Sequence, residues 1–359
     1  MQYTLMKSRR YSYSDLMVMA KGLLTAHELS EEAAGTTSEI LVEADLMGHV
    51  THGLALLPVY IDELKAGRMK HQGSPVIVSD NGSAVVWDGE YLSGTYLAGA
   101  AVAEALERSR KYPVVTYVIR RAHHIACLAA YMPKIIENGR VGILMASDPS
   151  AAMVAPFGGK SPVYSPNPVA AGIPSGPDGP VILDISTSTT AAGVVNRHIK
   201  AGKVLPGEWM LTADGEPSDD PKILTSGGSI LPLGGVDAGY KGYALGLLIE
   251  ALTSGLAGFG RAEKPDNWGT SVYLQIIDPE SFGGLRAFER EMGWVKAACK
   301  NSPPRRGYTD VRVPGDRALA LKAEQMEKGV WIETELIEAL YQRCCSSGIP
   351  FPAALEGRA

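Results

Sequence analysis

The stretch VVTYVIRRAHHIACLAAYMPKIIENGRVGILMA, residues 114–146, decides the fold class of this chain. Its two ends, 114–119 and 141–146, are rich in β-branched and apolar residues and have the composition of strands, whereas 128–137 between them reads as a helix. A strand, a helix and a second strand in succession are typical of sheets that are covered by helices. The stretch therefore predicts an α/β or α+β protein.

The same alternation continues on both sides and predicts one mixed sheet within residues 75–317. It begins with two short β-like runs on either side of the turn signal Asn81-Gly82. The predicted elements outside 114–146 are strands at 76–78 and 84–87, an alanine-rich helix at 96–110, a strand at 181–185 that leads into a helix reaching residue 200, a helix after Gly242, and a strand at 272–277.

Both ends of the chain read as helical. Residues 1–74 contain three helical runs, the second of which opens at Ser30, and residues 318–346 are rich in Glu, Lys and Ala. We expect residues 1–74 to pack with 318–359 as a helical domain, and residues 75–317 to form the mixed-sheet domain.

The composition excludes several classes of protein. The 359 residues are 45% hydrophobic and 20% charged, which is enough to bury a substantial core. A net charge of -5 argues against nucleic acid or an anionic membrane as partner. The four cysteines show no CxxC pair, and no apolar stretch follows the basic amino terminus or is long enough to cross a bilayer. We therefore expect a cytoplasmic protein.

Two histidine clusters are candidates for chemistry. The sequence DLMGHVTHG, residues 45–53, places His49 and His52 between glycines, and a ring there could act as general acid or base or could merely cap a helix end. His123 and His124 follow a predicted strand, and since adjacent side chains diverge, we expect at most one to act. A metal-dependent hydrolase or lyase that uses His49, His52 and His124 is the alternative, although no tight ligand motif supports it.

A nucleotide site would need an unusual form. Neither GxGxxG after a strand nor GxxxxGK[ST] occurs, so a Rossmann fingerprint and a P-loop are both missing. Three other stretches could hold phosphates, namely the turn after Ser147, the strand-to-helix passage at Asp184, and Lys241 at the predicted start of an apolar helix. Each could equally be an ordinary turn, helix cap or surface lysine.

In combination and in this order, these motifs resemble the type 2 malate/L-lactate dehydrogenase family over nearly the whole chain. Residues 45–53 resemble the family's acidic residue, glycine and Ser-His-Gly, with Thr51 in place of serine. The further matching positions are His124, the turn 156–159, Asn167-Pro168, the cofactor stretch Asp184-Ile185-Ser186-Thr187, Lys241-Gly242 and the turn 314–317.

The resemblance implies a homodimer with a non-Rossmann nicotinamide-binding fold. The sequence has no acidic residue of the Rossmann type that would separate NAD from NADP, and we expect NAD, with NADP as the alternative. It implies hydride transfer between the nicotinamide and a 2-oxo acid, a 2-hydroxy acid or a related cyclic imine. His52 would be the proton donor or acceptor, Thr51 would orient its ring or touch the substrate, and His124 would assist proton transfer or bind substrate. The cofactor would contact Ser147, Asp184, Ile185, Ser186, Lys241, Gly315, Asp316 and Arg317.

Two positions depart from the family pattern. The family commonly carries an arginine four residues after the catalytic histidine, where this chain has Leu56, so a bidentate grip on a substrate carboxylate is lost. The substrate could be bulkier or less acidic, or Arg120, Arg121 or a residue of a partner subunit could replace the arginine. The family's Gly-Thr before Asn-Pro is here Ser165-Pro166, which stiffens that turn.

Overall fold

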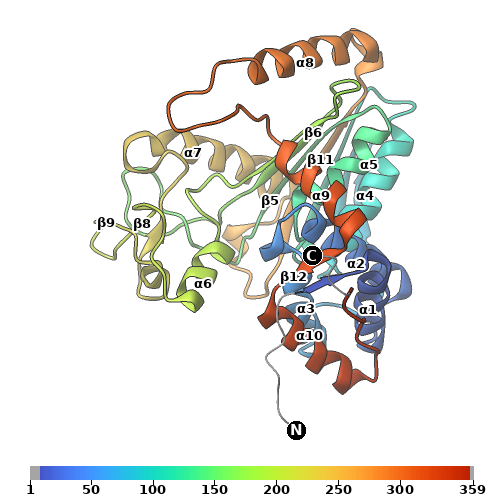
Figure 1. The fold of residues 1–359 in the computed structure, drawn as a ribbon, viewed down its shortest axis with the longest axis vertical. Helices are drawn as coiled ribbons and strands as arrows, with labels where there is room; N and C mark the ends of the chain where they lie inside the picture. The colour runs from blue at the N-terminus through green and yellow to red at the C-terminus, as the bar shows by residue number, and fades with distance from the viewer. Residues whose placement is uncertain (1–8, 356–359) are drawn as a thin grey trace.

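The computed structural model describes residues 9–355, and its centre is a seven-stranded mixed sheet (Figure 1). Every neighbouring pair of strands is antiparallel except β3 and β4, which run parallel. In spatial order the strands are β2 (Val76–Asp80), β3 (Ala84–Asp88), β4 (Val114–Ala122), β11 (Thr270–Ile277), β5 (Val141–Ser147), β6 (Val169–Ile173) and β7 (Val181–Ile185). The predicted mixed α/β class is confirmed.

Helices cover both faces of this sheet because side chains alternate along its strands. On β4, Val115 and Tyr117 belong to the main buried cluster, against which α4 (Gly94–Arg108) packs. Val118, between the same strand's inward residues, joins Tyr273 of β11 in a second cluster that includes the π-helical turn Ala251–Gly255. That turn continues α7 (Gly235–Glu250), so α4 and α7 lie on opposite faces.

The two ends of the chain meet at one side of the sheet (Figure 1). Strand β1 (Arg9–Tyr11) pairs with β12 (Val330–Ile332), so residues more than 300 apart are neighbours. The helices in this region are α1 (Tyr13–Ala26), α2 (Glu31–Leu46), α3 (Leu57–Lys65), α9 (Asp316–Lys328) and α10 (Thr334–Ser347). Their buried side chains are continuous with those of the large sheet.

The prediction of a helix through 318–346 is wrong at β12. Gly329 has φ +93°, which ends α9, and the β-branched residues Val330 and Ile332 then pair with β1 instead of continuing the helix. A side chain at Gly329 would also collide with Leu355. The pairing partner lies at the other end of the chain, so local periodicity could not reveal it.

The sequence-based prediction also missed one strand of the large sheet and misplaced the start of one helix. Strand β6 reads as VAAGI, and its alanines and glycine carry little strand signal. Helix α7 begins at Gly235, so Lys241 and Gly242 lie inside it and not at its start. The remaining elements are α5 (Met132–Glu137), α6 (Ala192–Ala201), α8 (Leu285–Lys300) and a small sheet of β8 (Met210–Leu211), β9 (Pro217–Ser218) and β10 (Ser229–Ile230).

Within residues 9–355, no helix combines the length and the apolar character that crossing a bilayer requires.

Candidate active site

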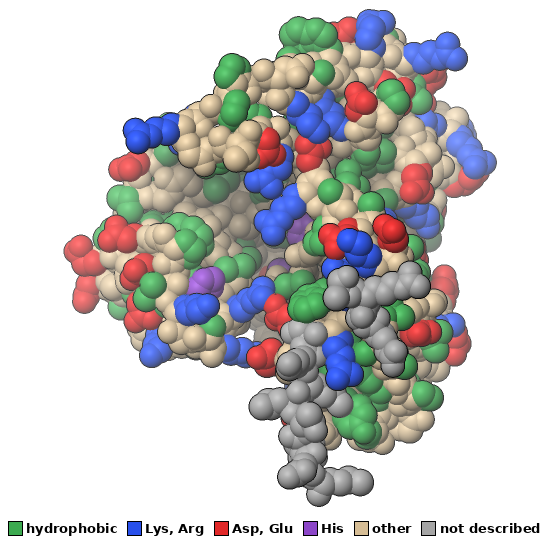
Figure 2. Space-filling model, viewed as in Figure 1, with side chains coloured by type: hydrophobic (Ala, Val, Ile, Leu, Met, Phe, Trp, Pro, Cys, Tyr) green, Lys and Arg blue, Asp and Glu red, His purple; other side chains and the backbone are tan. Residues whose placement is uncertain are grey.

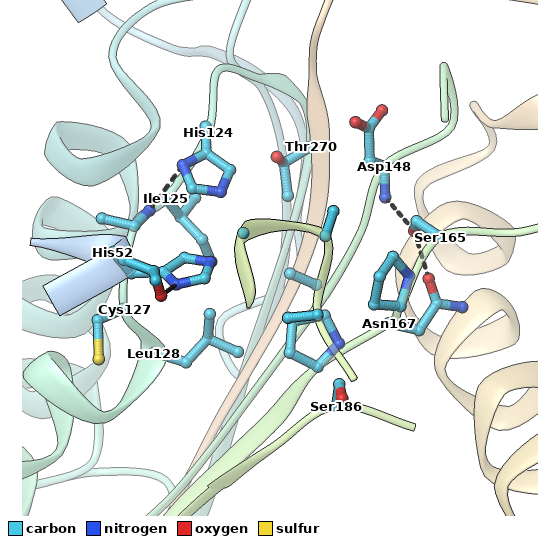
Figure 3. Close-up of a pocket in the computed structure, with 18 of the residues that line it drawn as sticks. His52, His124, Ile125, Cys127, Leu128, Asp148, Ser165, Asn167, Ser186 and Thr270 are labelled. Atoms are coloured by element: carbon cyan, nitrogen blue, oxygen red, sulfur yellow. Dashed lines mark hydrogen bonds between the residues drawn. The ribbon is translucent and has the colours of Figure 1, made fainter. Parts of the chain in front are cut away.

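A cavity of about 560 Å³ opens beside the carboxyl end of β7, a size within the range of small-molecule sites, roughly 300–1,000 Å³. The space-filling view shows the molecule hollowed between the part that carries α6 and the part that carries α3 and α9 (Figure 2). Figure 3 shows the cavity's walls, with His52 and His124 on one side and Ser165 and Asn167 on the other. Of the predicted site residues, those that line the cavity are Thr51, His52, His124, Ser147, Asp184 and Ser186.

The loop that carries His52 is held by a buried carboxyl group. After α2, Gly48 at φ +81° turns the chain, and Asp45 Oδ2 then accepts the amide N–H of Leu54 at 2.7 Å. A Cβ on Gly53 would lie 2.4 Å from Asp45 Oδ1, so only glycine fits there. Burial raises the pKa of Asp45 to about 8, against the weaker opposing effect of the Leu54 hydrogen bond.

His52 stands on the 3-10 turn Val50–His52 and pairs with its own neighbour. Its Nδ1 lies 2.9 Å from Thr51 Oγ1. Burial lowers the pKa of His52, while the carboxylate of Asp184 acts in the opposite direction. Its ring stacks on that of His124 with centroids 5.8 Å apart. A ring with a lowered pKa is mostly neutral at pH 7 and can accept a proton.

His124 follows β4 and its tautomer can be assigned from its neighbours. The amide N–H of Ala126 donates to Nδ1 at 3.3 Å, and Tyr60 Oη lies 2.8 Å from the same atom. Nδ1 is therefore an acceptor, and Nε2 carries the hydrogen of the neutral ring. Burial lowers the pKa of His124 well below its usual value, and Trp268 stacks on the ring with centroids 4.8 Å apart. His124 thus offers a ring N–H to a ligand.

The neighbouring histidine has a different environment. His123 is fully buried, with Nε2 3.5 Å from Glu63 Oε2, and burial lowers its pKa to about 4. The structure brings His124 to the cavity and leaves His123 in the core, because adjacent side chains point in different directions.

The arginines expected to replace the family's substrate-binding arginine are engaged elsewhere. Arg120 Nε donates to Asp88 Oδ2 at 2.8 Å, and Arg121 makes two hydrogen bonds to the same carboxylate, at 2.6 and 2.8 Å. Neither lines the cavity, so the expectation that one of them replaces the missing guanidinium is wrong. Leu56 does line it and leaves its wall apolar at that point.

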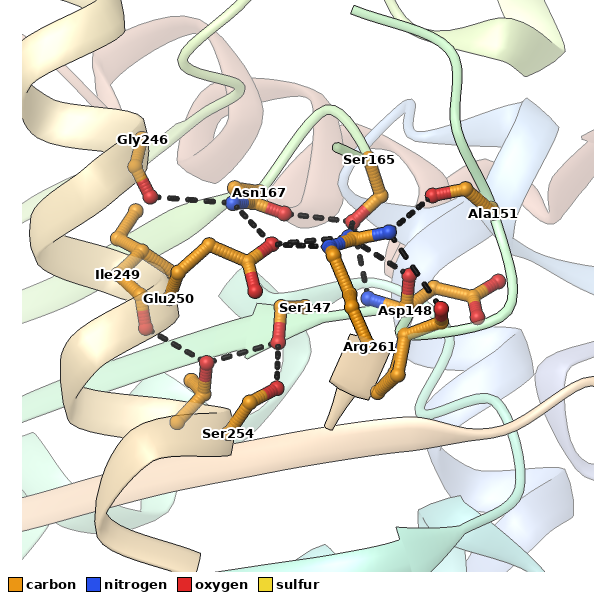
Figure 4. A network of polar contacts seen from close by, with 12 residues as sticks. Ser147, Asp148, Ala151, Ser165, Asn167, Gly246, Ile249, Glu250, Ser254 and Arg261 are labelled. Carbon is orange, nitrogen blue, oxygen red and sulfur yellow. Dashed lines mark hydrogen bonds and ion pairs between the residues drawn. The ribbon is translucent and has the colours of Figure 1, made fainter. Parts of the chain in front are cut away.

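A buried polar network supports the opposite wall (Figure 4). Arg261 bonds Glu250 at 2.8 Å and also donates to the carbonyl oxygens of Asp148 and Ala151. Glu250 accepts from Asn167 at 3.0 Å. One guanidinium therefore ties α7 to two loops whose residues line the cavity.

The predicted cofactor residues fall into two groups. Ser147 and Ser186 line the cavity, but Ser147 Oγ pairs with Thr253 Oγ1 at 2.7 Å, and Ser186 Oγ donates to the carbonyl oxygen of Ser188 at 3.0 Å. Asp184 accepts the amide N–H of Ala129 at 2.8 Å. The predicted residues that do not line the cavity are Ile185, Lys241, Gly315, Asp316 and Arg317.

These outlying positions still flank the strand that leads into the cavity. A Cβ on Gly315, which has φ +95°, would lie 2.9 Å from the backbone N of Ile182 on β7. A Cβ on Gly242 would lie 2.7 Å from the carbonyl oxygen of Thr187, just after β7. The turn at Gly315 and the segment of α7 at Gly242 are therefore held against the stretch 182–187. Lys241 is exposed on α7 and away from its amino end.

Sequence reasoning pointed to the passage from Asp184 into a helix but named no residue at the start of α6. Ala191, Ala192 and Gly193 line the cavity, and Ala191 provides no side-chain acceptor for the first amides of the helix. A Cβ on Gly193 would lie 3.4 Å from Thr51 Cβ and 3.9 Å from His52 Cε1. Three small apolar residues carry no signal of chemistry in a sequence.

Comparison with known proteins now decides the family. The malate/L-lactate dehydrogenase family matches residues 11–341. The chain belongs to this family. It is 30% identical to the L-sulfolactate dehydrogenase of Methanothermobacter thermautotrophicus, over 92% of this chain and 95% of that protein. It is 29% identical to the Delta(1)-pyrroline-2-carboxylate/Delta(1)-piperideine-2-carboxylate reductase of Pseudomonas syringae pv. tomato, over 92% and 95% respectively.

The fold agrees with solved structures of this family. The malate dehydrogenase of Entamoeba histolytica superposes with a TM-score of 0.91, covering 97% of this chain and 100% of that one, at 24% identity. The predicted family is confirmed, and this malate/L-lactate dehydrogenase family member is an oxidoreductase. The named relatives are dehydrogenases and reductases, which leaves the alternative of a metal-dependent hydrolase or lyase without support.

Proposed function

We propose that this protein is an NAD-dependent dehydrogenase that transfers a hydride between nicotinamide and a 2-oxo or 2-hydroxy acid, or a related cyclic imine. The observation that carries the proposal is the pairing of His52 and His124 on one wall of a cavity that also contains the uncapped start of α6. A proton-exchanging ring, a neutral N–H donor and free amides are what reduction of an anionic carbonyl compound requires.

The residues around the β7–α6 connection fit a nicotinamide dinucleotide. Gly193 keeps open the space between α6 and His52, which a larger side chain would fill. Asp184 and Ser186 line the same cavity. We assign the outer part of the cofactor to Lys241 and to the turn Gly315 to Arg317, because that turn and Gly242 pack against 182–187. A bound reduced nicotinamide supplies the hydride.

His52 and His124 have separate roles in this proposal. As a carbonyl carbon gains the hydride, negative charge develops on the oxygen, and protonated His52 donates its proton there. His124 Nε2–H stabilises the same oxygen by a hydrogen bond. In the oxidation direction, neutral His52 accepts the hydroxyl proton. Thr51 orients the His52 ring through the 2.9 Å contact to Nδ1.

The substrate's acidic group requires a partner other than arginine. Leu56 removes the guanidinium that the family resemblance implies, and Arg120 and Arg121 are bound to Asp88. We assign the carboxylate to the amides of Ala192 and Gly193, whose helix dipole favours an anion. The apolar Leu56 then faces the remainder of the substrate.

We further infer a homodimer. Apolar side chains along α7 and the π-helical turn are exposed, and a row of this kind is typical of a surface that another chain covers. The exposed residues are Val236, Tyr240, Leu245, Leu247, Leu248 and Leu256. The cysteines are all free thiols, which supports a reducing, cytoplasmic location. Sedimentation of the purified protein measures the dimer directly.

The test of function is a spectrophotometric screen of 2-oxo acids, 2-hydroxy acids and cyclic imines with NADH, NADPH and their oxidised forms. We expect turnover with NADH and an acid or imine. In the His52→Gln variant, kcat should fall by about 10²–10⁴-fold while NADH affinity stays nearly unchanged, because a proton-transfer group is lost and the cofactor contacts remain.

The pH profile of the reaction tests whether His52 supplies the proton. Reduction needs protonated His52, whose pKa is lowered, so kcat/KM for reduction should fall as the pH rises through that value, below 6.5. The His52→Gln variant should lack this slope. Equal turnover and an unchanged profile in the variant would show that another group supplies the proton. No turnover by the wild-type protein across the screen would refute the proposed substrate class.

A further inference from the structure

Three side chains of types that bind metal ions converge in the cavity. The proposed hydride transfer gives them no joint role. One ligand atom each from His49, Cys127 and Asp184 lies within 4.8 Å of the other two. His49 precedes the turn that carries His52, Cys127 precedes the 3-10 turn Leu128–Tyr131, and Asp184 lies on β7. All three line the cavity, and Figure 3 shows the Cys127 thiol below His52.

The spacing of two of these atoms matches a tetrahedral ion of the zinc type. Cys127 Sγ lies 3.5 Å from Asp184 Oδ2. Bond lengths of about 2.3 Å to sulfur and about 2.0 Å to oxygen, at a tetrahedral angle, place two such ligands roughly 3.5 Å apart. The distance between Cys127 Sγ and Asp184 Oδ2 in the present hydrogen bond is therefore almost the distance that a shared metal ion requires.

The surroundings of the cluster suit a metal site. The amide N–H of Ala129 donates to Asp184 Oδ2 at 2.8 Å and so fixes the direction of the carboxylate, as outer contacts do around metal ligands. Cys127 is buried. Among residues 9–355, the His49 side chain has no hydrogen-bond partner, so its ring can turn toward the other two ligands without breaking a bond.

We propose that His49, Cys127 and Asp184 bind one zinc ion, with the fourth ligand position open to the cavity. The set of one nitrogen, one sulfur and one oxygen ligand is of the kind that zinc accepts, and three protein ligands leave one position for water. On binding, the Cys127 thiol loses its proton to solvent and its sulfur becomes a thiolate ligand, so one proton is released for each ion bound.

Bound zinc inhibits the enzyme, a consequence that rests on the proposed function. The ion and its open position lie in the cavity that His52 and Thr51 also line, where the substrate is assigned. An ion there occupies space that the substrate needs and takes the Asp184 carboxylate from its place near His52. Inhibition by micromolar zinc should therefore be reversed by a chelator.

The test of the site uses cobalt(II), which replaces zinc and reports its ligands by absorption. Titration of the full-length protein should produce a thiolate-to-cobalt charge-transfer band in the near ultraviolet, saturating at one ion per chain and abolished by added zinc. Cys127→Ser should abolish the band and weaken zinc binding by more than about 100-fold, since even outer contacts cost 10–100-fold. His49→Gln should weaken it similarly.

The control is Cys299→Ser, which removes an exposed thiol and should leave the band unchanged. Far-ultraviolet circular dichroism confirms that each variant is folded. Absence of the band in wild-type protein, or its persistence in Cys127→Ser, overturns the metal site. In the activity assay, zinc should inhibit wild type and Cys299→Ser but not Cys127→Ser. A band without any dehydrogenase activity would support the site and refute the proposed function.

Discussion

Replacing Asp45 by asparagine isolates the effect of one buried carboxyl group on stability. Asp45 is only 2% exposed, and its pKa is raised from 3.8 to about 8 in the folded protein. In the unfolded chain it loses its proton near pH 4, whereas the folded protein keeps that proton until about pH 8. Between these values, the folded state binds one more proton than the unfolded state, so the free energy of unfolding decreases as the pH rises.

The size of the effect follows from this difference. One proton contributes about 1.4 kcal/mol per pH unit, and this slope declines as Asp45 itself ionises near pH 8, so the wild-type protein should lose about 2 kcal/mol between pH 6 and pH 8 through Asp45 alone. Above about pH 8 the slope should vanish. Asparagine cannot ionise but preserves the shape and the acceptor for the Leu54 amide. The Asp45→Asn variant should therefore lack this contribution.

The assay is chemical unfolding followed by tryptophan fluorescence at several pH values from about 5.5 to 8.5. The quantity of interest is the difference between wild type and variant at each pH, in which the other titrating groups cancel. Asp62→Asn is the matched control, because Asp62 is exposed, its pKa is lowered by Arg343, and it titrates below this window. Parallel curves for wild type and Asp45→Asn would show that Asp45 is ionised in the fold and would refute this reasoning.

Two further predictions concern the walls of the cavity. Leu56→Arg should raise kcat/KM for 2-oxo dicarboxylic acids by about tenfold or more relative to monocarboxylic acids, because a charge-assisted hydrogen bond contributes about 1.5–3 kcal/mol. Leu56→Met is the control. An unchanged ratio of the two kcat/KM values in Leu56→Arg would place the substrate elsewhere. Arg261→Met should destabilise the protein by about 3 kcal/mol and raise KM, since it leaves Glu250 partly buried without its partner. The double variant Arg261→Met/Glu250→Leu should recover much of the stability measured by chemical unfolding, and its failure to do so would mean that the pair is not coupled.

The strand and helix pattern was predictable where the signal is local. The runs that became β3, β4 and β5 are β-branched and bounded by turns, and Ser30 caps α2 as expected, with its side chain accepting from the Ala33 amide. β6 and β12 were not predictable, because one is built from small residues and the other is a strand only through pairing with the opposite end of the chain.

The candidate site was predictable as a set of residues and not as an arrangement. Thr51, His52 and His124 were identified from their motifs, and the structure brings them to one cavity. Lys241 was expected at the amino end of a helix, but α7 begins earlier because Gly234, at φ +103°, turns the chain there. The positions of Ala192 and Gly193 beside His52 depend on how α6 packs against the loop after α2, which no local pattern encodes.

The sequence by itself determined the family and the mixed α/β class. The order of the motifs and the local periodicity can both be read from neighbouring residues, without information on contacts between distant parts of the chain. Only the tertiary structure decided which histidine of the pair at 123 and 124 reaches the cavity, and that Arg121 binds Asp88 and not a substrate. It alone brought Cys127 within reach of Asp184. The direction of a side chain and the contacts between segments far apart in the chain depend on packing in the folded protein. Local sequence patterns do not encode that packing.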